Sequence, residues 1–442
     1  MSRWGIDDHL ITAALAAVRP GAGAEWEHEL DARLDDGGGD TVDLSEPGIR
    51  DELFARAIWA VLVEPGDSVA GALIAAVGPV AAARLVIDRA PAHTLSDATR
   101  GEVSIDRATE GLKRWTERLR ATDVMRSLES AARCGAVMLA PGDAHWPDGL
   151  AALGDSPPML LWARGDTALL RRPGVAIVGA RAATGYGEHV AMEFAAGLCA
   201  RDVVVISGGA YGIDGMAHRA ALASGGATIA VMAGGIDRIY PSGHEALLTR
   251  VADNGLLLSE VPCGTAPTKW RFLQRNRLIA ALAAATVVVE AGRRSGSLNT
   301  AGHSITMGRP VGIVPGPITS AASAGCHAML RTEPVECVTS VTEIMQLAFG
   351  ADGVLELPAP DDDEPDELAV VGVAGADDPL HIRVIDALRP RRGQSPVEIA
   401  RSVGEGSERI RGVLGVLELE GHAALGADDL WRRTALATTS RN

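Results

Sequence analysis

The chain of 442 residues contains little lysine, few aromatic residues and few cysteines. Lys113 and Lys269 are the only lysines, so arginine carries almost all of the positive charge. The five cysteines show neither CxxC spacing nor the pattern of a small disulfide framework. Their spacing excludes a zinc site of the CxxC type and favours a reducing compartment, so we expect no bound metal.

The sequence also lacks the segments that direct a chain into a membrane. The first residues, MSRWGIDDHL, do not combine a basic stretch with an apolar one, and no apolar run reaches about eighteen residues. We therefore expect a soluble cytoplasmic protein that does not contact a membrane. Its length and its hydrophobic content of 47% are sufficient for two or three domains with their own cores.

Acidic residues dominate the chain as a whole, but their distribution is uneven. The formal net charge is −16. Residues 171–334 hold 15 Arg and Lys against 10 Asp and Glu, a net charge of +5, whereas residues 350–378 hold 10 acids and no base. A basic central region inside an acidic chain is suited to local binding of phosphate groups.

Short apolar runs alternate with helical segments in the middle of the chain. Residues 48–135 are rich in Ala, Leu and Val without strand alternation, which predicts a helical domain. Strands are predicted at 175–178, 203–206, 228–232, 256–258, 286–289 and 311–314, with helices between most of them. The pattern predicts an α/β domain over residues 136–349, an extended Rossmann-like fold with a doubly wound parallel sheet and sites at the carboxyl ends of the strands.

Two further segments follow this domain. Residues 350–378 include APDDDEPDE, which cannot bury a core and predicts a disordered acidic linker. Residues 379–436 contain the capping box Ser395-Pro-Val-Glu398, a second helical segment at 407–420 and a turn near 421–431. This order predicts a winged-helix domain.

A glycine-rich loop directly follows the strand at 203–206 and reads SGGAYG. Glycines let the main chain approach a ligand, and the N-terminus of the next helix adds a positive dipole end. We interpret four of these residues as phosphate-binding: Ser207, Gly208, Gly209 and Gly212. Asp214 and His218 lie on one face of that helix. A catalytic Asp/His pair is possible, but without a Ser or Cys nucleophile we favour structural support of the loop.

The turn after the first strand reads GAR instead of GxGxxG. No acid ends the second strand at the position that would bind a ribose, so a dinucleotide is disfavoured and we expect no cofactor. Arg181 in this turn offers a guanidinium fork to a phosphate. The alternative is an ion pair with a nearby carboxylate.

The segment TKWRFLQRNRLI, residues 268–279, carries positive charge and aromatic rings but no acid. Cations that follow a phosphate backbone and rings that stack on bases are typical of proteins that bind single-stranded nucleic acid. We assign five of its residues to DNA binding: Lys269, Arg271, Arg275, Asn276 and Arg277. A solvated basic face, with Phe272 anchored in the core, is the alternative.

A second candidate anion loop follows the strand at 286–289 and reads EAGRRSGSLNT. Its exposed amides and hydroxyl groups come at the start of a helix. The candidate DNA-contacting residues are Arg293, Arg294, Ser295, Gly296, Ser297 and Thr300, with Gly316 at the end of the last strand. Glu290 is placed for acid/base chemistry or for holding Arg275 or Arg277, and we favour the structural role.

Taken in order, GAR, SGGAYGID, GGIDRIYP, LSE, RNRLIA, VEAGRRSGSLNTA and VPG resemble the DprA/Smf family of DNA-processing proteins. The resemblance extends from about residue 145 to residue 337. The carboxyl region with LELEGHAALGADDLWRR is similar to the winged helix of that family. Residues 1–47 then represent an N-terminal extension.

The resemblance implies a function as well as a fold. Such proteins bind and protect single-stranded DNA, usually as homodimers, and load the RecA recombinase on it during transformation. The residues that match the family's DNA-contacting motifs are Arg181, the loops 208–212 and 295–297, Arg275 and Arg277. No catalytic residue is implied. The alternative is a nucleotide-hydrolysing enzyme of the phosphoribohydrolase type, but VMAGGIDRIYP lacks the glutamate of a PGGxGTxxE loop.

Overall fold

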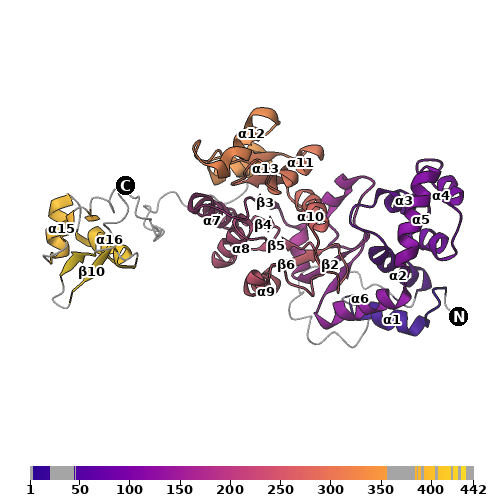
Figure 1. Cartoon of the computed structure of the whole chain (residues 1–442). Helices are drawn as coiled ribbons and strands as arrows, with labels where there is room; N and C mark the ends of the chain where they lie inside the picture. Colours follow the sequence, from indigo (N-terminus) through magenta and orange to yellow (C-terminus); the bar gives the residue numbers. More distant parts are fainter. Residues whose placement is uncertain are drawn as a thin grey trace. The chain divides into compact units, whose positions relative to one another are not determined.

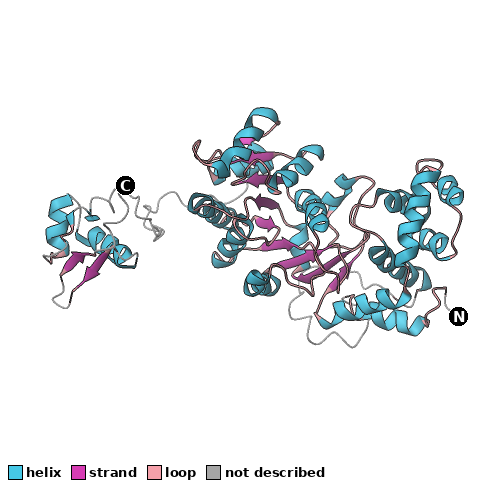
Figure 2. Ribbon diagram, in the orientation of Figure 1, coloured by secondary structure: helices cyan, strands magenta, loops and turns pink. Residues whose placement is uncertain are grey.

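The computed structural model of the chain describes residues 3–19, 44, 46–355 and, with short gaps, 384–434. The chain divides into two compact units, residues 1–360 and 361–442 (Figures 1 and 2).

The first part of the larger unit is helical (Figure 2). Its helices are α1 (Asp8–Ala16), α2 (Pro47–Leu62), α3 (Ser68–Ile87), α4 (Ala92–Ala98), α5 (Ile105–Arg118) and α6 (Ala121–Arg133). Trp59 of α2 and Trp115 of α5 pack edge to face at its centre, with ring centroids 5.1 Å apart. Ile11 and Leu15 of α1 are fully buried in the same core. The described part of the predicted N-terminal extension is therefore integral to the helical region.

Helix α3 is the one described helix that is long and apolar enough to cross a membrane, judged by length and composition. The count of consecutive apolar residues did not reveal it. Gly78 has a φ of +79° and is followed by Pro79, so the helix is kinked in its middle. Its first half packs Val69, Ala70 and Leu73 into the helical core.

Among the described residues, nine strands form one sheet in the order β1-β2-β6-β5-β4-β3-β7-β8-β9. The parallel strands are β3 (Gly174–Val178), β4 (Val204–Ser207), β5 (Thr228–Val231), β6 (Leu256–Ser259), β7 (Ala285–Val288), β8 (Val311–Ile313) and β9 (Glu336–Cys337). At one edge β1 (Val137–Leu139) and β2 (Leu161–Gly165) pair antiparallel. The predicted α/β class and the doubly wound sheet are confirmed, with each predicted strand within about one residue of the observed one.

Helices cover both faces of this sheet (Figure 1). One face packs against α10 (Lys269–Leu282), α11 (Ser297–Thr306) and α12 (Ala324–Thr332). The other face packs against α7 (Gly185–Cys199), α8 (Ile213–Ala223), α9 (Glu245–Asn254) and α13 (Val341–Leu355). Apolar residues of the helical region belong to the same core cluster as Trp162, Ala230 and Leu257 of the sheet. The helical region and the sheet thus share a continuous core.

The order of the strands reverses between β3 and β7, which are hydrogen-bonded neighbours. From β3 the chain proceeds to β4, β5 and β6 in one direction, and from β7 to β8 and β9 in the other. The loops that follow β3 and β7 therefore diverge and leave a crevice at the carboxyl edge of the sheet.

The described residues of the smaller unit include α15 (Pro396–Val403), α16 (Ser407–Leu419) and the antiparallel hairpin of β10 (Ala423–Leu425) and β11 (Trp431–Arg433). The capping box is present: the backbone N–H of Ser395 donates to Glu398 Oε2 at 2.9 Å, and that of Glu398 to Ser395 Oγ at 3.3 Å. The winged-helix assignment stays a prediction. Most of the predicted linker, residues 356–378, lies outside the described residues, while 350–355 belong to α13.

Candidate nucleic-acid interface

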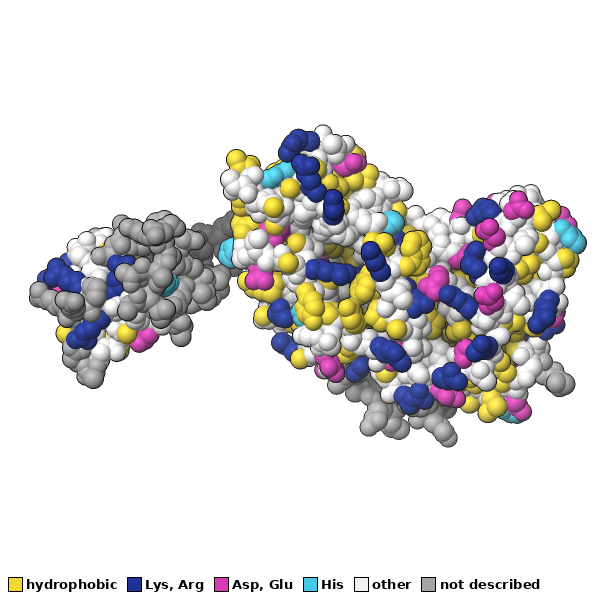
Figure 3. Space-filling model, in the orientation of Figure 1, with side chains coloured by type: hydrophobic (Ala, Val, Ile, Leu, Met, Phe, Trp, Pro, Cys, Tyr) yellow, Lys and Arg dark blue, Asp and Glu magenta, His cyan; other side chains and the backbone are white. Residues whose placement is uncertain are grey.

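A cleft of about 920 Å³ lies at the crevice, between the loops that follow β3 and β7 and the first turns of α10. In the part of the chain that the structure describes, its charged lining residues are Arg181, Lys269, Arg275, Arg293 and Arg294, with Asp214 as the one acid. On the face of the larger unit drawn in Figure 3, acidic side chains are gathered mainly over the helical region. The cleft therefore combines a concave shape with an excess of positive charge, which attracts polyanions.

The structure brings together more than half of the residues predicted to bind DNA. Those that line the cleft are Arg181, Lys269, Arg275, Asn276, Arg293, Arg294, Ser295, Gly296, Ser297 and Thr300. The others do not line it: Ser207, Gly208, Gly209, Gly212, Arg271, Arg277 and Gly316. Residues that share the basic segment 268–279 are thus separated by the fold.

Helix α10 presents its cleft-facing side chains from its first two turns. Thr268 caps the helix by accepting a hydrogen bond from the backbone N–H of Arg271 at 3.3 Å. Lys269, Phe272 and Asn276 lie on the side that lines the cleft. Asn276 Nδ2 donates to the Gly296 carbonyl at 3.2 Å, which ties the helix to the second candidate anion loop.

Arg275 is buried at the base of the cleft. Its Nη1 donates to the Gly208 carbonyl at 2.6 Å and also to the Val231 carbonyl. Its Nε has no hydrogen-bond partner among the described residues. Burial lowers the pKa of Arg275 to about 10, while the carboxylate of Asp214 partly offsets this effect. The guanidinium thus stays charged at neutral pH and contributes positive potential to the cleft.

The polar groups of the glycine loop are already used within the protein. Ser207 is fully buried and its hydroxyl donates to the Ile177 carbonyl at 2.6 Å, while the Gly208 N–H donates to Asp214 Oδ2 at 3.1 Å. Both polar groups therefore have partners within the protein, and the assignment of Ser207 and Gly208 to phosphate binding stays a prediction.

Gly209 and Gly212 are required for close packing in that loop. Both have positive φ, +67° and +73°. A Cβ at Gly209 would lie 2.9 Å from Leu248 Cδ2, and one at Gly212 would lie 2.2 Å from the Ala180 carbonyl oxygen. The close approach shown by the structure is to other parts of the chain, and the assignment of both glycines to phosphate binding stays a prediction.

Asp214 and His218 support the sheet and its loop. Burial raises the pKa of Asp214, and the charge of Arg275 opposes that shift. His218 Nδ1 lies 2.8 Å from Thr228 Oγ1, whose own hydrogen goes to the Val205 carbonyl at 2.7 Å, so Nδ1 carries the imidazole hydrogen. Burial lowers the pKa of His218 to about 3 and keeps the ring neutral.

Glu290 holds the loop that follows β3. Its carboxylate accepts from the Thr184 backbone N–H at 2.9 Å and from the Thr184 hydroxyl at 2.8 Å. Thr184 in turn caps α7 by accepting from the Gly187 N–H at 3.2 Å. The expectation that Glu290 pairs with Arg275 or Arg277 is therefore wrong, although its role is structural.

Two arginines assigned to DNA are engaged in ion pairs instead. Arg271 donates to Glu64 at 2.8 and 2.9 Å. Arg277 donates to both carboxylate oxygens of Glu260 at 2.6 Å, and its side chain is only 5% exposed. The structure shows these guanidinium groups paired with carboxylates, and their assignment to DNA binding stays a prediction. At Gly316 a Cβ would lie 2.3 Å from Ser323 Oγ, so the close approach is to the turn that precedes α12, and the assignment of Gly316 to DNA binding stays a prediction.

Aromatic side chains lie beside the cations. The Phe272 ring is stacked beneath Arg181, with Cζ 5.0 Å from its centroid, and lies 5.6 Å from the Tyr240 ring. Tyr240 is half exposed and lines the cleft, and the sequence analysis did not single it out. The feature of the sequence that could have identified Tyr240 is the motif GGIDRIYP, in which it lies at the end of the loop after β5. Trp270 is 55% exposed on the first turn of α10.

The fold and the cleft define a class: an α/β protein whose strand-order switch point carries a basic, aromatic-lined groove. The family of DNA recombination-mediator protein A matches residues 137–349. A DNA processing protein DprA of Mycobacterium tuberculosis (strain H37Rv) is 44% identical over 395 residues, which cover 86% of this chain and 94% of that protein. Protein Smf of Escherichia coli (strain K12) is 35% identical over 280 residues, 60% of this chain and 72% of that protein.

The comparison with solved structures gives a member of the same family. The X-ray structure of DNA processing protein A from Streptococcus pneumoniae is 28% identical, covers 70% of this chain and 99% of that one, and has a TM-score of 0.52. The chain belongs to the DprA/Smf family of DNA-processing proteins.

Proposed function

We propose that this protein binds single-stranded DNA in the cleft between β3 and β7, without catalysing a reaction. The observation that carries the proposal is the set of five cations around a groove whose single described acid, Asp214, is buried and bonded to Gly208 N–H. Arginines neutralise phosphates, and exposed rings such as Tyr240 offer stacking surfaces to bases without selecting a sequence.

A titration of labelled oligonucleotides over a series of salt concentrations tests this proposal. We expect the protein to bind single strands more tightly than duplexes of equal length, with little dependence on sequence. Removal of a groove cation by Arg293→Ala should weaken binding and lower the salt dependence. Arg133→Ala, on the exposed end of α6, is the matched control and should have no effect. Equal binding of single strands and duplexes would contradict the proposal.

We further propose that the protein protects the bound strand and loads the RecA recombinase on it in the cytoplasm, as a homodimer. Family membership supports this step. Single-stranded DNA coated with a single-strand binding protein should become a substrate for recombinase filaments sooner when the protein is present. Light scattering should give twice the chain mass. Chromatography of nucleoside monophosphates after incubation checks for hydrolysis, and release of free base would favour an enzyme instead.

A further inference from the structure

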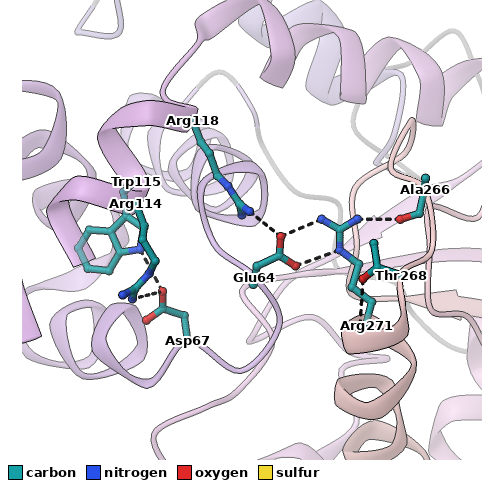
Figure 4. Close-up of polar contacts among 8 residues, drawn as sticks. All are labelled: Glu64, Asp67, Arg114, Trp115, Arg118, Ala266, Thr268 and Arg271. Atoms are coloured by element: carbon teal, nitrogen blue, oxygen red, sulfur yellow. Dashed lines mark hydrogen bonds and ion pairs between the residues drawn. The ribbon is translucent and has the colours of Figure 1, made fainter. Parts of the chain in front are cut away.

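The loop between α2 and α3 lies against α10 and is joined to it by Glu64. Arg271 donates to Glu64 from Nε at 2.9 Å and from Nη2 at 2.8 Å, and Arg118 of α5 donates to the same carboxylate at 2.6 Å (Figure 4). Burial alone would raise the pKa of Glu64, but the two guanidinium groups outweigh it and the pKa is lowered. Glu64 is thus a carboxylate shared by two arginines from different parts of the unit.

The helical region is joined to this loop by hydrogen bonds of Asp67. Asp67 caps α3 by accepting from the backbone N–H groups of Val69 and Ala70 at 3.1 and 3.2 Å. Its other oxygen accepts from Trp115 Nε1 at 3.0 Å and from Arg114 at 3.2 Å (Figure 4). Trp115 is fully buried. Three side chains of α5, those of Arg114, Trp115 and Arg118, thus donate hydrogen bonds to the two acids of this loop.

A second contact between this loop and α10 does not involve charge. Gly66 has a φ of +82°, and a Cβ at this position would lie 2.6 Å from Gln274 Oε1 and 3.6 Å from Arg277 Nε. Arg271, Gln274 and Arg277 are spaced three residues apart and so lie along one side of the helix. The loop packs along that side of α10.

The side of α10 that lines the cleft carries Lys269, Phe272, Arg275 and Asn276. Arg271 also donates to the Ala266 carbonyl at 2.7 Å, just before the Thr268 cap, so it links Glu64 to the chain segment that enters the helix. We propose that Glu64, acting through Arg271, is a positioning residue that sets the first turn of α10 for the DNA strand. This inference rests on the proposed function.

The variant Glu64→Gln tests the proposal by titration with single-stranded oligothymidine. Removal of the shared charge should weaken binding about three- to tenfold, which lies within the range of coupling between residues of one ion-pair network, while the salt dependence stays unchanged because no phosphate contact is lost. Glu64→Asp, which keeps the charge, should restore part of the affinity. Glu52→Gln is the matched control, since Glu52 lies on α2, the helix that precedes this loop, and its described ion pair is with Arg56 of the same helix, at 2.9 Å.

If Glu64 acted only through its negative charge near the cleft, Glu64→Gln would change the DNA affinity in the opposite direction. Loss of an acid beside a basic cleft would tighten binding, and unchanged or tighter binding of Glu64→Gln would overturn the proposal. Arg271→Gln should weaken binding as Glu64→Gln does, and the double variant should add little to either. A salt slope lowered by Arg271→Gln would show a direct phosphate contact and would also overturn it.

Hydrogen exchange of the free protein separates this inference from the proposed function. Peptides that cover residues 266–273 should exchange faster in Glu64→Gln than in the unchanged protein, with no DNA present. Unchanged exchange would overturn the positioning role. If the unchanged protein binds no single-stranded DNA, the proposed function fails; if it binds but Glu64→Gln binds equally well, only the present inference fails.

Discussion

Arg181 provides the sharpest test of the cleft because it is exposed and has no described ion pair to lose. Its guanidinium lies over the Phe272 ring, with Cζ 5.0 Å from the centroid, and it lines the cleft. Replacement by alanine removes one charge-assisted phosphate contact. At an exposed site such a contact contributes about 1–2 kcal/mol, which corresponds to a loss of affinity of about five- to thirtyfold.

The salt dependence gives an independent measure of the same contact. Each phosphate neutralised on a single strand contributes about 0.7 to the slope of log affinity against log salt concentration. Arg181→Ala should lower the slope by about that amount in a fluorescence anisotropy titration. Arg181→Lys keeps the charge but loses the planar fork, so it should restore the slope and only part of the affinity.

The unfolding transition of Arg181→Ala serves as the control. The cation–π contact with Phe272 contributes only about 0.5–1 kcal/mol at an exposed site, so the melting temperature should change little. A variant with unchanged slope and affinity would refute the assignment of Arg181 to DNA. A variant that loses affinity together with much of its stability would leave the slope as the deciding measurement.

Three other substitutions test the structural roles around the cleft. Arg277→Ala leaves the buried carboxylate of Glu260 without its ion-pair partner and should lower the free energy of unfolding by about 3–5 kcal/mol in urea titrations. The salt dependence of DNA binding should stay unchanged, and a weaker salt dependence would show that Arg277 contacts a phosphate. Gly212→Ala forces a Cβ to 2.2 Å from a carbonyl oxygen and should lose clearly more stability than Gly225→Ala, which has a similar φ but open space, so equal losses would argue against the packing role. Because burial lowers the pKa of His218 to about 3, the unfolded state takes up its proton first as pH falls below about 6.5, and stability should drop by up to about 1.4 kcal/mol per pH unit down to about pH 3. His218→Gln should remove that component of the pH dependence, and an unaltered profile would contradict a buried neutral ring.

Local pattern was sufficient for much of the fold and for part of the site. Each parallel strand from β3 to β8 is a short apolar run, and a run of this kind is visible without knowledge of its neighbours. The Ser395 capping box is equally local, since both partners lie within one helical turn. The cleft loops were recognised because glycine, serine and arginine directly follow such strands.

The ion pairs could not be predicted, because both acids that engage the basic segment lie elsewhere in the chain. Glu64 is 207 residues from Arg271, and Glu260 is separated from Arg277 by a loop and most of α10. The glycine loop presents the same difficulty. Its composition is that of an anion site, but only the structure shows that Asp214 from the next helix already accepts one of its N–H groups.

By itself, the sequence determined that residues 268–279 form a basic segment, without an acid, between two strands of a parallel sheet. It could not determine the use of each charge. Helical geometry separates the segment into one side with Lys269 and Arg275 at the cleft and another with Arg271 and Arg277 against carboxylates. These four cations are equivalent in composition. The electrostatic free energy of each charge depends on the groups within a few ångströms of it, and only the tertiary structure brings those groups together.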